Sequence, residues 1–355
     1  MMKKIIPMLL CTMVMLLLFA TPVQANESNS LVGSSYTNTP VQQTIAMISK
    51  DQKEMADLED WHLKVKEISV PKKKGCYELI YPATKYKAVP CATLPARPFS
   101  KEPSSEIVGN GNDWSIRLYE GKFSTADGYF GNVSGLEKES DDGQSDDYTL
   151  QLNTQFFDSP PICNGSDCQG WQQFIYSTDY PYEEGCTDGC LFMQYWLLNY
   201  SGQCPDNWDS SGGSCYRNSS KAISIPSQSI SALPDLLLRG STTASGSNGA
   251  TDALTLFTSK SAYAVNEGAS YLDLYDYWDT AEFNVFGNGG GSEAVFNAGT
   301  SIPVGLTGFP TNSEDTATYV KEGYTGETNN LTLSSTPPTV TSQAGTVFMK
   351  FVESN

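Results

Sequence analysis

The stretch Tyr148-Thr-Leu-Gln-Leu-Asn-Thr-Gln155 decides the fold class. Its residues alternate in type: Leu150, Leu152 and Thr154 take one set of positions, and Gln151, Asn153 and Gln155 take the other. Successive side chains of a strand point to opposite faces of a sheet, so this period of two predicts a half-buried β-strand.

Similar short runs of β-branched and aromatic residues flank this stretch from residue 113 onward, separated by Gly, Asn, Ser and Asp clusters. They predict strands over 114–119, 128–133, 148–157, 171–176, 191–200, 222–225, 253–259, 261–265, 279–286, 293–296 and 346–352. No amphipathic helix interrupts them. Many short strands at this spacing predict an all-β fold, a β-sandwich or jelly roll of the concanavalin-like kind.

The first part of the chain follows other patterns. A Lys-Lys start, an apolar run over 5–19 and Val23-Gln-Ala25 predict a secretory signal peptide over 1–25. Helical spacing of apolar residues over 41–68 predicts a helix, and the Pro-rich stretch 92–111 predicts a linker. We therefore divide the chain into the signal peptide, an N-terminal pro-like segment (26–110) and a β-sandwich domain (111–355). No later apolar run is long enough to span a membrane.

The charge of the chain is strongly acidic and unevenly spread. It has 22 Lys and Arg against 40 Asp and Glu, a net charge of −18, which argues against a nucleic-acid partner. Residues 26–110 hold 11 basic and 10 acidic residues (net +1), whereas residues 111–355 hold 9 and 30 (net −21). Either the N-terminal segment is a pro-segment on an acidic cleft, released by protonation, or it is a helical cap or linker.

Eight cysteines remain once Cys11, inside the signal peptide, is set aside. An even number in an exported chain indicates disulfides and a secreted or periplasmic location. Their irregular spacing disfavours a thiolate metal site, so no metal is expected. Pairing between sequence neighbours is the simplest arrangement: Cys76–Cys91, Cys163–Cys168, Cys186–Cys190 and Cys204–Cys215.

The single histidine, His62, excludes zinc and iron sites built from several imidazoles. Carboxylates are then the economical choice for acid–base chemistry. Glu282 lies between Ala281 and Phe283 on the predicted strand 279–286, in an aromatic-rich segment. Burial among aromatic rings would raise its pKa and suit it to proton transfer. The rival interpretation is an exposed charge on a solvated strand face.

Three glutamines are candidates to donate an amide N–H to a developing oxyanion, which a carboxylate cannot do. Gln172 and Gln173 are neighbours on one predicted strand, so they point to opposite faces. Gln194 lies on the aromatic strand that follows. The sequence leaves the choice among them open, and a structural contact is the ordinary role of such a residue.

This order of motifs resembles the glutamic peptidases of the eqolisin type, which are secreted acid endopeptidases with a β-sandwich fold and pro-segments. Ala281-Glu282-Phe283 matches their Glu motif, and Gln173, then Gln172, best matches their Gln. The resemblance implies a cofactor-free hydrolase and zymogen in which Glu282 activates water and Gln173 holds the oxyanion. We expect the aromatic residues Trp171, Tyr195 and Trp196 to contact the substrate.

Two departures from that family stand out. No second carboxylate follows Glu282, because Asn284, Val285 and Phe286 occupy the next positions, and the Gln lies in the context Trp171-Gln-Gln-Phe174. The segment Gly75-Cys76…Tyr81-Pro82…Val89-Pro90-Cys91 is also similar to one in a family of secreted bacterial proteins to which we attach no activity.

The alternative function is a non-catalytic binding module for carbohydrate or cell wall. The chain has 6 Trp and 19 Tyr, whose rings could stack on sugars. The Glu-x-Asp-x-Glu strand of retaining glycosidases is absent, because Glu282-Phe-Asn-Val-Phe286 stands in its place. The expected partner is therefore a peptide or polysaccharide.

Overall fold

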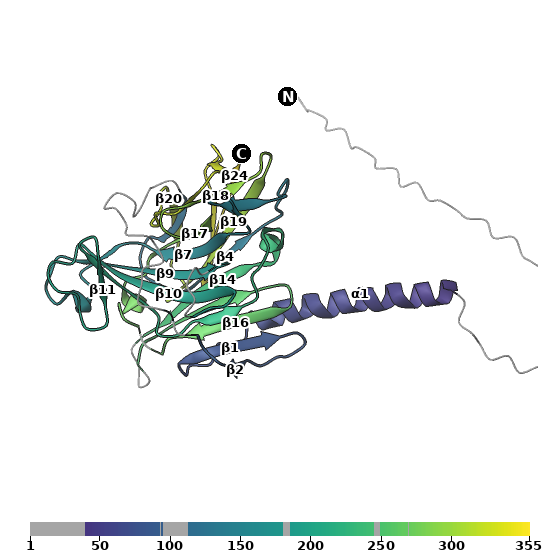
Figure 1. The fold of residues 1–355 in the computed structure, drawn as a ribbon, viewed down its shortest axis with the longest axis horizontal. Helices are drawn as coiled ribbons and strands as arrows, with labels where there is room; N and C mark the ends of the chain where they lie inside the picture. The colour runs from purple at the N-terminus through teal and green to yellow at the C-terminus, as the bar shows by residue number, and fades with distance from the viewer. Residues whose placement is uncertain (1–39, 93, 95–112, 180–184, 245–248, 269) are drawn as a thin grey trace, which may run out of the picture. The chain divides into compact units, whose positions relative to one another are not determined.

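The structure is a computed structural model that describes residues 40–92, 94, 113–179, 185–244, 249–268 and 270–355, with side chains from residue 52 onward. The predicted signal peptide (1–25) and most of the predicted linker lie outside the described residues. Helix α1 spans Pro40–Val65, and most of the remaining secondary structure is β-strand (Figure 1). No helix in the described part of the chain has the length and apolar character needed to cross a membrane.

Two large antiparallel sheets form the fold. Sheet I runs in the order β2 (Lys87–Val89), β1 (Gly75–Ile80), β16 (Ser261–Asn266), β15 (Thr251–Phe257), β14 (Leu237–Thr243), β4 (Phe123–Phe130), β19 (Ser301–Pro310), β24 (Thr346–Ser354) and β22 (Thr332–Leu333), with β23 (Thr339–Gln343) also paired to β24.

Sheet II runs in the order β11 (Asp209–Ser211), β12 (Ser214–Asn218), β10 (Gly189–Leu198), β9 (Gln169–Ser177), β7 (Tyr148–Thr154), β17 (Thr280–Gly287), β3 (Ser115–Leu118) and β20 (Ala317–Val320). Strand β13 (Ile223–Ile225) pairs with β10, and β8 (Phe157–Asp158) with β9. A small sheet joins β21 (Thr328–Asn329), β18 (Glu293–Phe296), β5 (Glu139–Asp141) and β6 (Gln144–Ser145). Short 3₁₀ turns lie at Pro161–Cys163, Ile230–Asp235 and Leu274–Asp276.

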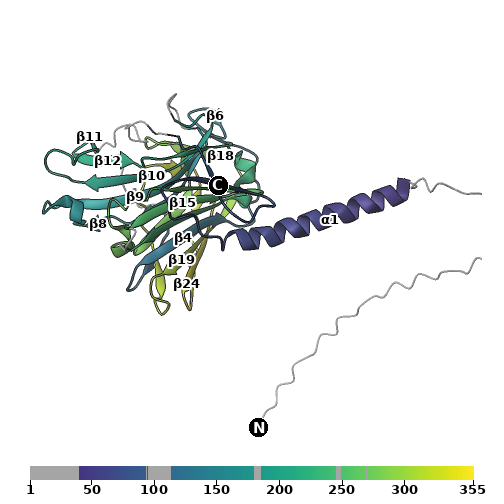
Figure 2. The ribbon, with the colours of Figure 1, turned by 90° about the horizontal axis from the view of Figure 1, so that it is seen from below.

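The two large sheets pack face to face, and Figure 2 shows them as two layers. Phe283 of sheet II lies so close to Gly128 of sheet I that a Cβ at residue 128 would come 2.0 Å from its ring. Phe174 meets Gly240 in the same way, at 2.7 Å. Glycines in one layer therefore admit aromatic rings from the other, and the predicted all-β sandwich is confirmed.

Each predicted strand overlaps an observed one, although 128–133 covers only the end of β4. Two central strands, β14 and β19, were missed, as were shorter ones such as β1, β12, β20 and β23. Strands β14 and β19 contain Gly240, Gly305 and Gly308, with Pro303 and Pro310 also in β19. These residues weaken the local signal for a strand. The glycines are required by packing, because a Cβ at Gly305 would lie 2.5 Å from the Tyr129 ring, and one at Gly308 would lie 2.3 Å from Phe123.

The predicted N-terminal segment contributes strands to sheet I. Strand β1 pairs with β16 over six residues, from Gly75 to Ile80, and β2 pairs with β1. The C-terminal part of α1 packs on the same sheet through Trp61 and Val65, which are buried beside Leu79 and other apolar residues. Removal of residues 26–110 would therefore take two strands from sheet I. The division at residue 110 stays a prediction.

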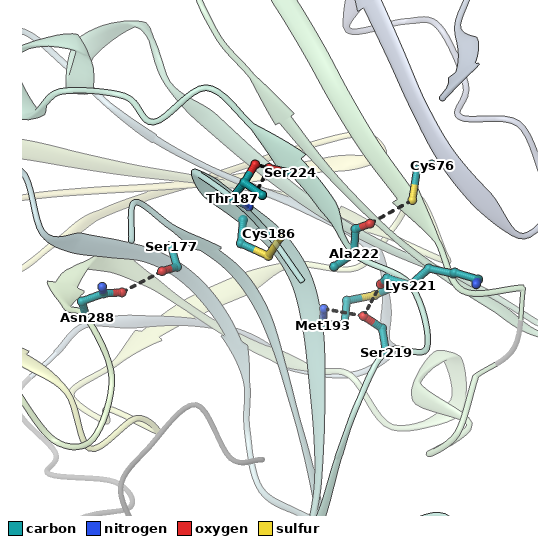
Figure 3. The surroundings of a disulfide bond; sticks show 11 residues. Cys76, Ser177, Cys186, Thr187, Met193, Ser219, Lys221, Ala222, Ser224 and Asn288 are labelled. Carbon is teal, nitrogen blue, oxygen red and sulfur yellow. Dashed lines mark hydrogen bonds between the residues drawn. A yellow bond between two sulfur atoms is a disulfide. The ribbon is translucent and has the colours of Figure 1, made fainter. Parts of the chain in front are cut away.

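All four predicted disulfides are present: Cys76–Cys91, Cys163–Cys168, Cys186–Cys190 and Cys204–Cys215. Figure 3 shows Cys186 beside Thr187, whose main-chain N–H donates to Ser224 Oγ at 3.2 Å. In the same view, the Cys76 sulfur lies 3.2 Å from the carbonyl oxygen of Ala222. Disulfides of this number indicate an oxidising compartment outside the cytoplasm.

Candidate active site

A row of polar residues crosses sheet II on one face. The strand register places them directly opposite one another on adjacent strands, in the order Ser115, Glu282, Asn153, Gln173, Gln194 and Asn218. Paired residues of antiparallel strands share a face. We call this the outer face, and we call the face that carries Phe283 and Phe174 toward sheet I the inner face.

Hydrogen bonds join the centre of this row. Asn153 Nδ2 donates to Glu282 Oε2 at 2.8 Å and lies 3.4 Å from Gln151 Oε1. Gln173 Nε2 donates to the same Gln151 oxygen at 2.9 Å. Glu282 and Gln173 are thus two strands apart, about 9–10 Å between backbones, and connected through two amides. The Oδ1 atom of Asn153 is buried there, and none of the described residues forms a hydrogen bond with it.

Glu282 is almost completely buried, with 1% of its surface exposed. Burial raises the pKa of its carboxyl well above the ordinary value, and the negative charge of Asp113 raises it further. Hydrogen bonds from Asn153 and from the main-chain N–H of Tyr324 act in the opposite direction. The expectation of an exposed charge on a solvated strand does not hold, because the sheet and the chain around Tyr324 exclude water from it.

A segment of main chain after β20 lies along the outer face. The N–H of Tyr324 donates to Glu282 Oε2 at 3.0 Å, and Ser115 Oγ donates to the carbonyl of Glu322 at 2.6 Å. Farther along, Glu327 Oε2 lies 3.4 Å from Gln151 Nε2. The carboxylate of Glu282 therefore contacts a peptide backbone supplied by the chain itself.

The three candidate glutamines differ in orientation and in partners. Gln173 and Gln194 lie on the outer face with Glu282, whereas Gln172 points to the inner face and lies beside the buried Asp252. Gln194 is held at both ends, because its Nε2 donates to Asn218 and its Oε1 accepts from Trp196 Nε1 at 2.9 Å. The amide nitrogen of Gln173 carries two N–H groups. Among the described residues, it donates one hydrogen bond, to Gln151.

The predicted substrate-binding aromatic residues divide between the two faces. Trp171 and Trp196 pair on the outer face and form a buried cluster with Tyr216 and Tyr324. Tyr195 lies on the inner face and is fully buried in the sandwich core. It is therefore separated from Glu282 by the sheet itself, because adjacent residues of a strand point to opposite faces.

Two carboxylates flank the amide that follows Glu282 on its own face. Asn284 Nδ2 lies 3.1 Å from Asp113 Oδ2 and 3.1 Å from Glu353 Oε2. Burial raises the pKa of Asp113 to about 7 and that of Glu353 to about 8. The sequence lacked a second carboxylate after Glu282, and the fold supplies two from distant strands and loops.

Sequence reasoning missed several residues of this site. Asn153 and Gln151 lie on the polar side of the alternating stretch 148–155, but nothing in the sequence links them to Glu282. Asp113, Glu327 and Glu353 gave no sequence signal, because they reach the site only through tertiary contacts. The described part of the chain contains no group of three or more His, Cys, Asp or Glu side chains arranged to hold a metal ion.

Comparison with known proteins gives little further information. No protein-family model matches the chain, and no curated protein matches it in sequence. Among solved structures, a match is found to Scytalido-glutamic peptidase bound to a peptide-based transition-state analogue, with a TM-score of 0.26 and 13% identity. The match covers 68% of this chain and 98% of that chain.

Proposed function

We propose that the protein is a peptide hydrolase in which Glu282 transfers protons and Gln173 stabilises the oxyanion. The observation that carries the proposal is the hydrogen-bonded network on the outer face that joins Glu282, through Asn153 and Gln151, to Gln173. Buried polar side chains cost stability unless they are well paired. A row of them that includes a carboxylate of raised pKa is typical of a functional site.

The contact with Tyr324 supports a peptide as the substrate class. Glu282 accepts a main-chain N–H, and the Tyr324 ring packs against Phe156, with centroids 5.3 Å apart, in the cluster that holds Trp171. An extended peptide with an aromatic side chain would make the same contacts. Because Glu282 is buried, a substrate must displace this part of the chain, and opening of residues 322–325 around Tyr324 is a step of the proposed reaction.

The proposed mechanism uses a single water molecule. Ionised Glu282 accepts a proton from water, whose oxygen attacks the peptide carbonyl carbon. The resulting oxyanion accepts an N–H from Gln173, and Asn153 is close enough in the row to add a second donor. Protonated Glu282 then donates its proton to the amide nitrogen as the C–N bond breaks. The products are a carboxylic acid and an amine.

A carbohydrate-binding module is the weaker alternative. Such a module presents exposed aromatic rings, but five of the six tryptophans are buried: Trp61, Trp171, Trp196, Trp208 and Trp278. Trp114 is half-buried and stands against Tyr319, with ring centroids 5.3 Å apart. We therefore rank sugar binding below peptide hydrolysis.

The test is proteolysis of an unfolded protein between about pH 2.5 and 8, followed by mass spectrometry. We expect Glu282→Gln to lower the rate by about 10³-fold and Gln173→Ala by about 10²-fold. Glu139→Gln is the matched control, because Glu139 is equally buried but belongs to the small sheet. Activity that survives in Glu282→Gln, or is lost equally in Glu139→Gln, would contradict the proposal.

The pH profile provides a second readout. The base must be ionised, and its pKa is raised, so the rate should climb with pH at values above those of an ordinary glutamate. Asp113→Asn removes a like charge that contributes to the shift. We expect this variant to move the acid limb of the profile to lower pH, which a purely structural effect would not do.

A further inference from the structure

A cavity of about 330 Å³ opens on the outer face beside Asn284. Three buried carboxylates line it, from Asp113, Glu327 and Glu353. The cavity also has apolar walls, to which Phe286, Leu331 and Leu333 contribute. A pocket of this volume is at the small end of the range for ligand sites and suits a side chain better than a polymer.

Within the described part of the chain, the carboxylates of the pocket accept hydrogen bonds from neutral donors only. The oxygens of Asp113 and Glu353 lie 3.1 Å from the same Asn284 nitrogen, so they are no more than 6.2 Å apart. Asn329 Nδ2 approaches Glu353 at 3.3 Å, and the N–H of Gly291 donates to Glu327 at 3.2 Å. Closely spaced buried acids with amide partners repel each other unless they are protonated or meet a cation.

One basic side chain, that of Lys321, contributes to the lining of the pocket. The residue is exposed, and its ammonium lies 5.9 Å from the centroid of the Trp114 ring. The ion pairs found among the described residues do not include it. The three carboxylates of the pocket therefore face one lysine that does not reach them.

We propose that this pocket binds the cationic side chain of a lysine or arginine in a peptide ligand. The carboxylates would accept hydrogen bonds from the ammonium or guanidinium group, and such charge-assisted bonds are stronger than neutral ones. The apolar walls would contact the methylene stem, as they do for buried lysine and arginine stems elsewhere in proteins. A bare metal ion would make no use of those walls.

The pocket lies close enough to Glu282 to select which peptides are cleaved, so this inference rests on the proposed function. Asn284 is two residues from Glu282 on the same strand and face, about 6–7 Å along the backbone. An extended peptide lying over Glu282 would place a side chain within one or two residues of the cleaved bond in the pocket. The substrate class is then a peptide with a basic residue near the cleavage site.

Binding of a cation should be linked to proton release. Burial raises the pKa of Asp113 to about 7 and that of Glu353 to about 8. The charged groups around them are Glu282, Glu327 and Lys321. A bound cation favours the ionised form of the acids, so binding should expel a proton near neutral pH and weaken as the pH falls.

The experiment measures binding in the Glu282→Gln chain, so that hydrolysis cannot interfere. The probes are two peptides, acetyl-Ala-Lys-Ala-amide and the same peptide with norleucine, which has nearly the same shape without the charge. By calorimetry at pH 7, we expect the lysine peptide to bind about tenfold more tightly or better. Glu353→Gln should reduce this ratio to about threefold or less, and Glu120→Gln, at an exposed position, should leave it unchanged.

A second measurement uses no substitution in the pocket, so a misfolded variant cannot account for its result. In two buffers of different ionisation enthalpy, only the lysine peptide should show proton release on binding. Equal affinity for both peptides, a ratio unaffected by Glu353→Gln, or no difference in proton release would overturn the pocket assignment. If the lysine preference is present but the wild-type chain cleaves nothing, the pocket stands and the proposed hydrolase fails.

Discussion

The two faces of sheet II are equally buried but chemically opposite. On β7 and β17, the side chains of both faces have 1% exposure or less. Those of the inner face are apolar: Leu150, Leu152, Phe283 and Val285. Those of the outer face are polar: Gln151, Asn153, Glu282 and Asn284. Apolar burial stabilises a fold, whereas buried polar groups cost free energy unless they are paired. The inner face therefore accounts for the stability of the sandwich, and the outer face is the place to look for function.

The neighbours Phe283 and Glu282 provide the largest contrast. Phe283→Ala removes a fully buried ring from between the sheets and should lower the free energy of unfolding by about 3–5 kcal/mol. Glu282→Gln keeps the shape, and at pH 5 the raised pKa of Glu282 leaves its carboxyl neutral, so the substitution should change the stability by less than about 1 kcal/mol. Urea unfolding of both variants measures this difference. Equal losses would mean that the outer face is also primarily structural.

The contact between Gly128 and Phe283 tests the inner face from the other sheet. A methyl group at residue 128 would lie 2.0 Å from the ring, so Gly128→Ala should cost about 1–3 kcal/mol through overpacking. Combining it with Phe283→Leu, which makes room, should recover part of that loss. Strict additivity of the two substitutions, measured by a double-mutant cycle, would show that they do not share this contact.

The carboxylates of the outer face should make stability depend on pH. An acid whose pKa is raised on folding holds its proton more tightly in the folded chain, so stability falls as the pH rises from its ordinary pKa to the raised one. For Glu353 this window runs from 4.5 to about 8. We expect thermal stability to fall from pH 5 to pH 8, by up to about 1.4 kcal/mol per pH unit for each such group.

Paired variants separate this effect from the general repulsion of an acidic chain. Glu353→Gln should stabilise the protein more at pH 8 than at pH 5. Asp142→Asn removes one negative charge from an exposed turn, where Asn tolerates the positive φ of 46°. It should have a small effect that hardly changes with pH. The same pH slope in both variants would remove Glu353 as a cause.

Local patterns in the sequence were sufficient for the fold class and for the disulfides. The alternation in 148–155 and the short runs around it correspond to strands of the two sheets. The predicted half-buried strand is wrong for β7, because its polar side is as buried as its apolar side. The neighbouring cysteines pair because each pair closes a short loop. Strands β14 and β19 were missed because their glycines make room for aromatic rings of other strands. Those rings lie outside the short stretch of sequence from which a strand is predicted.

The candidate site could be predicted only in part. Glu282 was singled out by its aromatic surroundings, and Gln172 and Gln173 by the chemistry of their amides, but their sequence positions could not show which glutamine shares a face with Glu282. Tyr195 was placed with the substrate on the basis of a resemblance, and it lies in the core. Its neighbour Trp196 is on the outer face, so an error of one residue along a strand reverses the side.

The sequence by itself determined which residues alternate, which cysteines are neighbours and that a glutamate lies on an aromatic strand. The tertiary structure alone decided that Glu282, Asn153 and Gln173 share one row and that Asp113 and Glu353 meet at Asn284. Asp113 and Glu353 are 171 and 69 residues from Asn284 in the chain. The register between strands and the packing of sheets set such contacts, and both depend on interactions between distant residues that no local pattern contains.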